Sequence, residues 1–343
     1  MFDERDTSPP DRALELLARR VLVVIPALNE AAHIEDCLRS LMRGSAALSL
    51  LQVIVADGGS TDGTRGIVNG LSDTFPNVSL IDNPGRLQAA GVNAGAQLAE
   101  YGRDILVRCD AHADYPEDYI LNLALKLEET GAASVVVPMD AQGTTCFQRA
   151  NAWVVDTPLG SGGSAHRGGS TSGYVDHGHH AAFRLEHFLR LGGYDETFSH
   201  NEDAEYDARL SQAGGKIYLD ADIRVGYFPR TTISGLWRQY FGYGRGRARN
   251  LLKNGQRPRL RQLVPVQNLL LLAASLLVVV LTPLALAWPV FYLGVLGLVS
   301  VWFVVVKKSL CGLWAGPALG AMHLSWGLGF LAGVFASMRA RTA

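Results

Sequence analysis

The sequence predicts an α/β protein whose mostly parallel sheet is flanked by helices and followed by C-terminal transmembrane helices. Up to residue 138, short apolar runs of strand length alternate with segments in which apolar residues recur at helical spacing. Repeated strand–helix units of this kind specify a parallel sheet that is covered on both faces. From residue 263 the composition becomes almost continuously apolar.

The first 138 residues contain the regular strand–helix pattern. Residues 1–20 are expected to be a flexible N-terminal segment with a short helix at 11–20, and their acidic, proline-containing start is unlike a signal peptide. The expected strands are 21–25, 51–56, 78–81, 105–109 and 133–138, and the expected helices are 30–42, 61–71, 87–101 and 116–129.

After residue 138 the pattern is less regular. A mobile loop is expected at 160–173, which is rich in glycine and serine and contains His166 and Arg167. The elements expected around it are helices at 147–155, 202–212 and 234–253 and strands at 174–183, 216–219 and 223–228. We therefore expect an α/β domain at 21–232 and a basic amphipathic helix at 233–262.

The apolar C-terminal region is expected to enter a membrane. Segments 263–287, 290–306 and 317–338 are long enough to span a bilayer, so residues 263–343 form a transmembrane region of two or three helices. The connection at 287–289 is so short that the first two helices must form a hairpin.

Basic residues indicate how that hairpin is oriented. The lysines at 307–308 return to the side of the arginines at 257–261, which is consistent with a cytoplasmic face. Arg339 and Arg341 fit poorly with a third crossing, so the topology of the last segment stays open.

The distribution of charge and of cysteines indicates which partners, redox compartment and metal sites the sequence favours. The net charge of −1 identifies no partner, but residues 238–261 contain eight Lys or Arg residues and no acid. The four cysteines show no paired spacing, which favours a reducing compartment and argues against a zinc site: Cys37, Cys109, Cys146 and Cys311.

A first polar cluster follows the apolar run at 105–107. Asp110, His112 and Asp114 occupy alternating positions, which project to one side of an extended backbone. Two or three such groups could hold a divalent cation, and the cation could hold a diphosphate. The alternative is a polar loop that only closes a strand.

Other polar clusters follow earlier strands. Asn29 could cap the helix that begins after the first strand. Asp57 opens a glycine-rich segment at 57–64 and could accept a hydrogen bond from a base N–H or a sugar hydroxyl. Arg86 could contact a phosphate, although a surface arginine is an equally good interpretation.

These motifs together resemble a known family. Ile-Pro-Ala-Leu-Asn-Glu at 25–30, Asp-Gly-Gly-Ser-Thr-Asp-Gly-Thr at 57–64, Asp-Ala-His at 110–112 and Asn-Glu-Asp at 201–203 are similar to those of family 2 inverting glycosyltransferases of the GT-A fold. The resemblance covers about residues 21–250 and is strongest to the ExoA-like subgroup, associated with succinoglycan and other exopolysaccharide assembly.

The resemblance implies a nucleotide-sugar site. Asp57 would hold the uracil of a UDP-sugar, and Asp110 and His112 stand where the family usually has Asp-x-Asp, which binds ribose and the metal of the diphosphate. Histidine is a softer ligand than carboxylate, so Mn²⁺ becomes at least as plausible as Mg²⁺, and Asp114 could share this role. The residues that would line the rest of the nucleotide pocket are Pro26, Ala27, Asn29 and Glu30.

The resemblance also assigns the acid pair Glu202 and Asp203, with Asp203 as catalytic base. An inverting transfer needs one carboxylate to take the proton from the acceptor hydroxyl. Without the resemblance, the two acids could simply be helix N-terminal residues favoured by the macrodipole. Asp195 is a further possible base, although its context suggests a turn.

The basic helix departs from the Gln-x-x-Arg-Trp pattern of the family. Gln239, Arg245 and Arg247 could serve near the diphosphate or acceptor, or the helix could anchor the protein at the membrane interface, and both could hold. For the histidines of residues 177–180, acceptor-side hydrogen bonding or a surface position is favoured over a metal site: His177, His179 and His180.

The function expected from these features is transfer of a hexose from a UDP-sugar, with UDP-glucose the expected donor, to a polyprenyl-diphosphate-linked saccharide. The enzyme would sit in the bacterial plasma membrane with a cytoplasmic catalytic domain, use Mn²⁺ or Mg²⁺, contact membrane lipids and bind no nucleic acid. Alternatives are transfer to polyprenyl phosphate, a processive polysaccharide synthase, or a scaffold that binds nucleotide-sugar without turnover.

Overall fold

The computed structural model describes residues 9–164 and 167–342. The chain divides into two compact units, the first comprising residues 1–139 and 169–226 and the second residues 140–168 and 227–343. The short strands β6 (Met139–Ala141) and β10 (Val225–Tyr227) pair with each other where the chain passes from one unit to the other.

The first unit contains an eight-stranded sheet in the order β3-β2-β1-β4-β8-β5-β9-β7. Neighbouring strands are parallel except at β8 and β7, which run opposite to their neighbours. The strands are β1 (Val21–Ala27), β2 (Gln52–Asp57), β3 (Val78–Asp82), β4 (Ile105–Arg108), β5 (Ser134–Val137), β7 (Gly173–Val175), β8 (His179–Arg184) and β9 (Ile217–Leu219).

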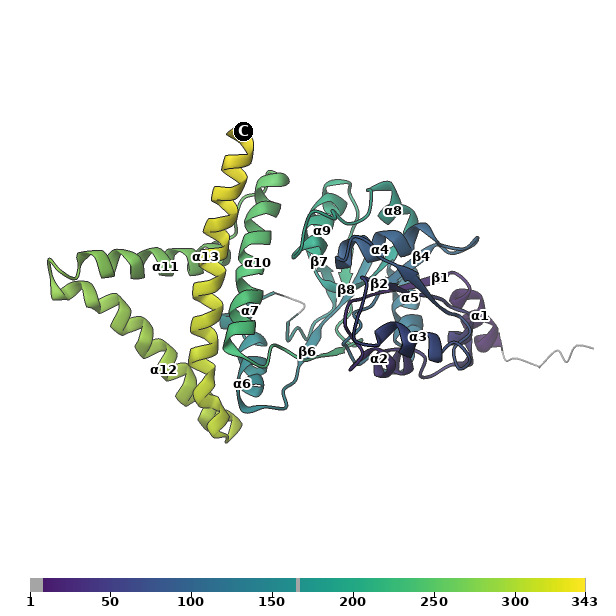
Figure 1. Ribbon diagram of the computed structural model, residues 1–343, viewed down its shortest axis with the longest axis horizontal. Coiled ribbons are helices and arrows are strands. Elements are labelled where there is room, and N and C mark those ends of the chain that lie inside the picture. The colour runs from purple at the N-terminus through teal and green to yellow at the C-terminus, as the bar shows by residue number, and fades with distance from the viewer. Residues whose placement is uncertain (1–8, 165–166, 343) are drawn as a thin grey trace, which may run out of the picture. The chain divides into compact units, whose positions relative to one another are not determined.

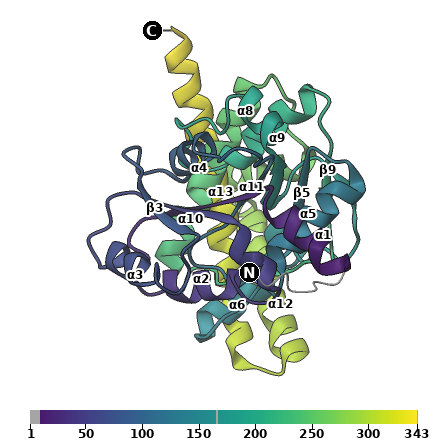
Figure 2. The same ribbon diagram turned by 90° about the vertical axis from the view of Figure 1, so that its right-hand side faces the viewer.

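Helices cover both faces of this sheet. Figures 1 and 2 show α2 and α3 on one side and α4, α8 and α9 on the other. The helices of this unit are α1 (Pro9–Ala18), α2 (Ile34–Leu41), α3 (Thr64–Gly70), α4 (Gln88–Gln97), α5 (Tyr119–Thr130), α8 (Leu185–Arg190) and α9 (Glu202–Gln212), with a 3-10 turn, η1, at Ala46–Leu50.

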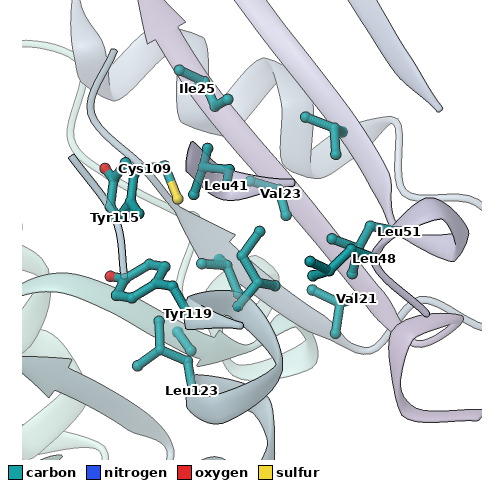
Figure 3. Packing of buried hydrophobic residues seen from close by; sticks show 14 of the residues in the cluster. Val21, Val23, Ile25, Leu41, Leu48, Leu51, Cys109, Tyr115, Tyr119 and Leu123 are labelled. Atoms are coloured by element: carbon teal, nitrogen blue, oxygen red, sulfur yellow. The ribbon is translucent and has the colours of Figure 1, made fainter. Parts of the chain in front are cut away.

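Side-chain alternation along the strands builds two cores. In β1, Val21, Val23 and Ile25 face a cluster with α2 and α5, part of which is drawn in Figure 3, while Leu22 and Val24 face the opposite cluster. Both sets are fully buried, as expected for a strand in the middle of a sheet that is covered on both sides. This burial on both faces explains why the strands have continuous apolar runs in the sequence.

The direction of β8 matters for the site. The carboxyl ends of β1, β2 and β4 lie at one edge of the sheet because these strands are parallel. Because β8 is antiparallel to β4 and β5, its first residue, His179, lies at that same edge. A ligand site at the carboxyl edge of such a sheet therefore includes the beginning of β8.

The second unit is helical. It contains α6 (Cys146–Val155), α7 (Pro158–Ser161), α10 (Ile233–Lys253), α11 (Leu260–Val278), α12 (Ala287–Lys307) and α13 (Ala315–Thr342), with 3-10 turns η2 (Pro283–Leu286) and η3 (Leu310–Trp314). Segments 260–278, 283–307 and 310–339 are long and apolar enough to cross a membrane.

Several features differ from the sequence-based expectations. The helix expected at 11–20 is α1 at 9–18, but its Leu17 and Ala18 are buried in the first core, so this part of the N-terminal segment is packed and not flexible; residues 1–8 lie outside the described residues. The expected strand at 174–183 is two strands, β7 and β8. The expected domain at 21–232 also includes residues 140–168, which belong by contact to the second unit.

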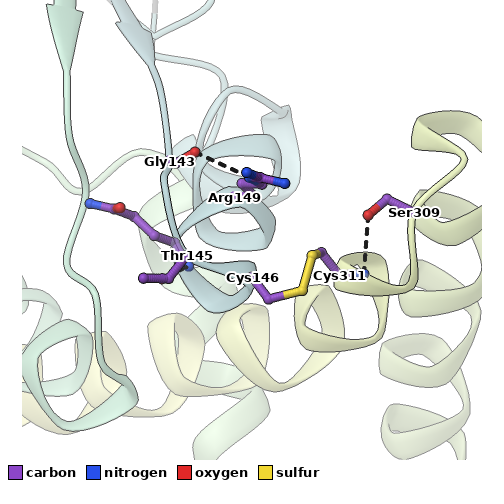
Figure 4. The surroundings of a disulfide bond; sticks show 7 residues. Gly143, Thr145, Cys146, Arg149, Ser309 and Cys311 are labelled. Carbon is purple, nitrogen blue, oxygen red and sulfur yellow. Dashed lines mark hydrogen bonds between the residues drawn. A yellow bond between two sulfur atoms is a disulfide. The ribbon is translucent and has the colours of Figure 1, made fainter.

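The apolar region and the cysteines need further correction. The turn of the hairpin lies at 279–286, and the residues expected to form it, 287–289, are already in α12. Two cysteines, Cys146 at the start of α6 and Cys311 in η3, form a disulfide across 165 positions of sequence, as Figure 4 shows. Spacing along the sequence does not reveal a pair so far apart. Cys37 and Cys109 are free and buried.

Candidate active site

The loops that follow β1 and β2 are tied to each other. Asn29 has a left-handed backbone with φ of 56°, its amide N–H donates to Ser60 Oγ at 2.8 Å, and its Oδ1 accepts from the Thr61 N–H at 2.9 Å. The expectation that Asn29 caps a helix is wrong, because α2 begins only at Ile34. Asn29 instead sets the path of the glycine-rich loop at 57–64.

Asp57 is the last residue of β2, and among the described residues only one of its two carboxylate oxygens accepts hydrogen bonds. Oδ2 accepts from the N–H groups of Gly59 and Ser60 and from Arg65 Nη1 at 2.9 Å, while Oδ1 is buried without a hydrogen-bond partner among the described residues. Burial alone would raise the pKa of Asp57, but the hydrogen bonds from Ser60 and Arg65 outweigh it and lower the pKa. The site therefore presents an ionised acceptor that lacks a donor.

Other predicted pocket residues lie around the same strand ends. Pro26 and Ala27 are the last residues of β1 and pair in register with Ala56 and Asp57. Arg86 is exposed and has a left-handed backbone with φ of 56°. Their contacts with a nucleotide stay a prediction.

The segment after β4 does not have the extended backbone that the sequence suggested. Residues 111–112 form a turn, and the three side chains therefore have different neighbours. His112 Nδ1 lies 3.0 Å from Glu30 Oε1, and Asp114 is 3.9 Å from Arg43. Asp110 turns inward, where its N–H donates to Tyr115 Oη at 2.6 Å.

A buried arginine lies beside Asp110. Arg108 is fully buried in β4, and its Nη2 lies 3.4 Å from Asp110 Oδ1 and 3.1 Å from Gln88 Oε1. Its Nη1 lies 3.4 Å from Glu202 Oε1, at the start of α9. One guanidinium thus compensates carboxylates at two different elements, as buried charges require.

His179 makes a second bridge between the same two elements. Its Nδ1 lies 2.7 Å from Asp203 Oδ2, and its Nε2 lies 3.4 Å from Asp110 Oδ2. Burial alone would lower the pKa of His179, but hydrogen bonds with Asp110 and Asp203 outweigh it and raise the pKa to about 9. The imidazole is therefore a cation between two carboxylates near neutral pH.

The two acids at the start of α9 have different environments. Burial raises the pKa of Glu202, and the nearby Arg108 only partly offsets this. Burial acts in the same direction on Asp203, but its hydrogen bond from His179 and the nearby charges of His177 and Arg108 hold the pKa well below its usual range. Of the two, Asp203 is therefore the acid that stays ionised.

His177, two residues before His179, also lies next to a carboxylate of α9. His177 Nδ1 lies 2.7 Å from Asp207 Oδ2, one helical turn after Asp203 in α9. A surface position for His177 and His179 is thus wrong, because carboxylates of α9 hold both rings. The side chain of His180 lies outside the described part of the chain. Strand direction would have revealed His179, since β8 begins at the carboxyl edge.

The predicted residues of the basic helix lie on α10, in the second unit. Gln239 Nε2 donates to Tyr227 Oη at 3.2 Å and to Tyr243 Oη at 3.0 Å. Arg245 is exposed and Arg247 half-buried. The role of these three side chains stays a prediction.

Comparison with known proteins places the chain in the family that its sequence motifs resemble. Residues 22–192 match the family described as Glycosyl transferase family 2. Over 320 residues the chain is 43% identical to the succinoglycan biosynthesis protein ExoA of Rhizobium meliloti (strain 1021), and the match covers 92% of this chain and 95% of that protein.

More distant relatives share the architecture. Over 235 residues the chain is 26% identical to the dolichyl N-acetyl-alpha-D-glucosaminyl phosphate 3-beta-D-2,3-diacetamido-2,3-dideoxy-beta-D-glucuronosyltransferase of Methanococcus voltae, covering 65% of this chain and 71% of that protein. The solved mannosyltransferase PcManGT from Pyrobaculum calidifontis, in complex with GDP-Man and Mn²⁺, matches with a TM-score of 0.60 at 17% identity, covering 92% of this chain and 87% of that one.

The structural match identifies the fold as GT-A-like. The family match at residues 22–192 includes the carboxyl ends of β1, β2 and β4 and the start of β8, and the match to the ExoA protein covers 92% of the chain. This chain therefore belongs to glycosyl transferase family 2 and is an ExoA-like glycosyltransferase.

Proposed function

We propose that this glycosyltransferase moves glucose from UDP-glucose to a polyprenyl-diphosphate-linked saccharide, with inversion at the anomeric carbon. Its membrane helices would anchor it in a bacterial plasma membrane with the catalytic residues on the cytoplasmic side. Because the relative with 43% identity is named for succinoglycan biosynthesis, we infer that the product is an intermediate of an exopolysaccharide of this kind.

The observation that carries the proposal is the ionised Asp203 at the start of α9, held by His179. In an inverting transfer, the acceptor oxygen bonds to the anomeric carbon while the bond from that carbon to the diphosphate breaks. Asp203 takes the proton of the acceptor hydroxyl in the same step. Two carboxylates whose environments push their pKa values apart are the usual sign of such a division of roles.

Asp57 supports a nucleotide donor. Its buried Oδ1 lacks a donor, and an imide N–H of uracil would supply one. A guanine N–H has similar donor chemistry, so GDP-sugars belong in the donor screen. Pro26, Ala27, Asn29, Glu30 and Arg86 are proposed to complete the pocket, and Gln239, Arg245 and Arg247 to contact the diphosphate or the acceptor.

A divalent cation would be held by Asp110 and His112. The described residues contain no group of three His, Cys, Asp or Glu side chains that could hold an ion alone. The Asp110 carboxylate and the His112 imidazole, of which the latter is 43% exposed, would supply two ligands, and substrate phosphates would supply the rest. Such mixed ligands suit Mn²⁺ at least as well as Mg²⁺. When bound, the ion would neutralise charge on the departing diphosphate.

The acceptor proposal rests on the membrane helices. Three segments are long and apolar enough to cross a bilayer, and the basic residues of α10 suit anionic headgroups. A polyprenyl-linked acceptor and an anchored enzyme meet in two dimensions, which favours a lipid-linked saccharide over a soluble one.

The test measures UDP and GDP release by purified protein in nanodiscs, with a panel of nucleotide sugars, with Mn²⁺, Mg²⁺ or EDTA, and with a polyprenyl-linked lipid extract. We expect release with UDP-glucose that needs the cation and the lipid, and loss of release in Asp203→Asn with UDP binding kept. Asp195→Asn is the matched control, because Asp195 accepts the N–H of Thr197 in a local turn and is not the acid that His179 contacts.

Other outcomes select the alternatives. Release that needs only polyprenyl phosphate would identify the first sugar transfer to the lipid, and a growing polymer would identify a processive synthase. UDP binding without release under any condition would identify a nucleotide-sugar-binding scaffold.

A further inference from the structure

His179 joins the segment after β4 to the start of α9, as Arg108 also does, and it is the one of the two that contacts Asp203. Asp110 belongs to the end of β4, where the nucleotide is proposed to bind, and Asp203 belongs to the start of α9. The same imidazole lies 3.4 Å from Asp110 Oδ2 and 2.7 Å from Asp203 Oδ2. We propose that His179 is a positioning residue that holds Asp203 in the orientation needed for proton removal, an inference that rests on the function proposed above.

The backbone around His179 is built for this placement. The β5–β8 pairing has an irregularity between Val135 and Val137, and Val137 pairs with His179. A Cβ at Gly178 would overlap the side chain of Val136, so only glycine allows this approach. Bulges of this kind next to a site commonly redirect a side chain.

The contacts fix the Asp203 carboxylate from two sides. Its Oδ1 accepts the N–H of Ala204 at 2.7 Å, and its Oδ2 accepts the Nδ1–H of His179. A carboxylate offers about four lone-pair positions, so two remain for the acceptor hydroxyl. Among the described residues, removal of the imidazole would leave the Ala204 N–H as the only hydrogen-bond donor to the Asp203 carboxylate and would let the side-chain χ angles of Asp203 change.

Arg108 strengthens this arrangement without replacing it. It joins Asp110 to Glu202, whereas His179 joins Asp110 to Asp203. The three carboxylates and two cations are joined in the order Glu202, Arg108, Asp110, His179 and Asp203. Of the two cations, His179 is the one that contacts the proposed base, and it acts on the reaction through that base.

Amide substitutions separate the two contacts of the ring. His179→Asn keeps an N–H donor near the position of Nδ1, and His179→Gln keeps one near Nε2. The assay measures kcat and KM with UDP-glucose and the lipid extract, together with the Kd of UDP as a test of folding. His187→Asn, on α8 and outside this network, is the control.

We expect His179→Ala and His179→Gln to lose kcat by at least tenfold with the UDP Kd changed less than threefold, and His179→Asn to recover most of the loss. A kcat for His179→Ala within twofold of the wild type would overturn the inference, as would equal losses in the Asn and Gln variants. If His179→Ala fails to fold, the comparison of Asn with Gln decides.

Asp203→Asn separates this inference from the function itself. If Asp203→Asn is inactive while His179→Ala is fully active, the base assignment stands and only the role of His179 is wrong. If Asp203→Asn keeps full activity, both are wrong.

A different observation carries a second inference, about α13. Phe241 of α10 lies against Gly329 of α13, and Arg245 of α10 lies against Gly333, so the two helices run side by side in the same direction. A Cβ at Gly244, Gly329 or Gly333 would collide with backbone atoms of the opposite helix. Such contacts make α10 and α13 one packed pair.

The basic residues of α10 limit where the packed pair of helices α10 and α13 can lie relative to the membrane. It carries five basic residues and no acid: Arg238, Arg245, Arg247, Arg249 and Lys253. Arg245 lies against Gly333, within the apolar segment 310–339, and Arg238 lies two helical turns earlier on α10, so a crossing by this segment would bring these two charges toward hydrocarbon, which is unfavourable. By contrast, only 11% of the apolar window of 260–278 and 17% of that of 283–307 are buried within the protein, against 56% for 310–339.

We infer that α11 and α12 form the only membrane-crossing hairpin among the described residues, and that α13 lies with α10 at the membrane surface. The partner of this surface is the anionic lipid leaflet, to which the basic face of α10 is complementary. The C-terminus then lies on the same side of the membrane as Lys307.

Reporter fusions to the full chain test this arrangement. GFP fused to the C-terminus in a bacterial host should fluoresce, alkaline phosphatase there should be inactive, and a cysteine replacing Leu284 at the tip of the hairpin should react with an impermeant maleimide from outside. An active phosphatase and dark GFP at the C-terminus, with Leu284→Cys still labelled from outside, would show that α13 crosses and overturn the inference.

Discussion

Arg65 Nη1 lies 2.9 Å from Asp57 Oδ2, and the same atom lies 2.7 Å from Asp82 Oδ1 at the end of β3. The guanidinium thus ties the two strand ends together and keeps the Asp57 carboxylate ionised and oriented. The other oxygen of Asp57 is the buried acceptor that is proposed to bind the nucleotide base. Arg65 therefore supports the site although it is not assigned a contact with substrate.

Loss of Arg65 should weaken nucleotide binding. We expect Arg65→Met to raise the Kd of UDP about tenfold, because a hydrogen bond between charged groups contributes roughly 1.5 kcal/mol or more. Isothermal titration in nanodiscs measures this. Arg39→Met, which removes an exposed pair with Glu35 on α2, is the control and should leave the Kd unchanged. An unchanged Kd in Arg65→Met would contradict the role given to this arginine.

The raised pKa of His179 predicts a pH-dependent stability. The folded protein keeps the proton up to a pKa of about 9, whereas the unfolded chain releases it near the ordinary histidine pKa of 6.5. The contribution to stability is therefore complete below pH 6.5 and is lost as pH rises through about 9. Thermal unfolding in EDTA should show the midpoint falling over this range in the wild type and falling less in His179→Asn. Equal slopes in both proteins would count against a charged His179.

The disulfide between Cys146 and Cys311 should stabilise the second unit. It closes a loop across 165 positions of sequence, for which the chain-entropy account gives about 5 kcal/mol as an upper value. Reduction should lower the unfolding midpoint of the wild type and leave that of the Cys146→Ser/Cys311→Ser variant unchanged. Thiol titration of the denatured, unreduced protein should find two of the four cysteines reactive. Four reactive thiols would show that the bond is absent.

Arg108 should be important for folding as well as for the site. Its removal would leave Asp110 and Glu202 buried near each other without their shared cation. We expect Arg108→Met to lower the free energy of unfolding by about 3–5 kcal/mol, the usual cost of breaking a buried pair. Arg108→Lys keeps the charge and should lose less. Denaturant unfolding of the two variants makes the comparison, and a loss below about 1 kcal/mol for Arg108→Met would show that the acids are compensated in another way.

Much of the fold could be predicted because strand and helix periodicity differ. The runs that became β1, β2 and β4 are buried on both faces, and such strands have a continuous apolar sequence. Asp203 could be proposed because Asn-Glu-Asp at 201–203 follows an ordered set of motifs that together resemble those of family 2 glycosyltransferases. These signals are local in sequence.

The parts that could not be predicted depend on distant contacts. His179 looked like a surface residue because the direction of β8 is decided by its neighbours, β4 and β5, and not by its own residues. Arg108 directly follows the apolar run at 105–107, and its two acidic partners come from the loop after β4 and from α9. The disulfide joins residues 165 positions apart in the sequence, where no spacing rule applies.

The central claim is an inverting transfer with Asp203 as the base, and the configuration of the product tests it most directly. The wild-type enzyme would be given UDP-glucose, whose anomeric carbon is α-configured, and the new linkage would be read from its anomeric coupling by NMR. The account predicts a β-linked product, since a single base acting on the acceptor allows direct displacement of the diphosphate. An α-linked product would contradict it, because retention requires a different mechanism.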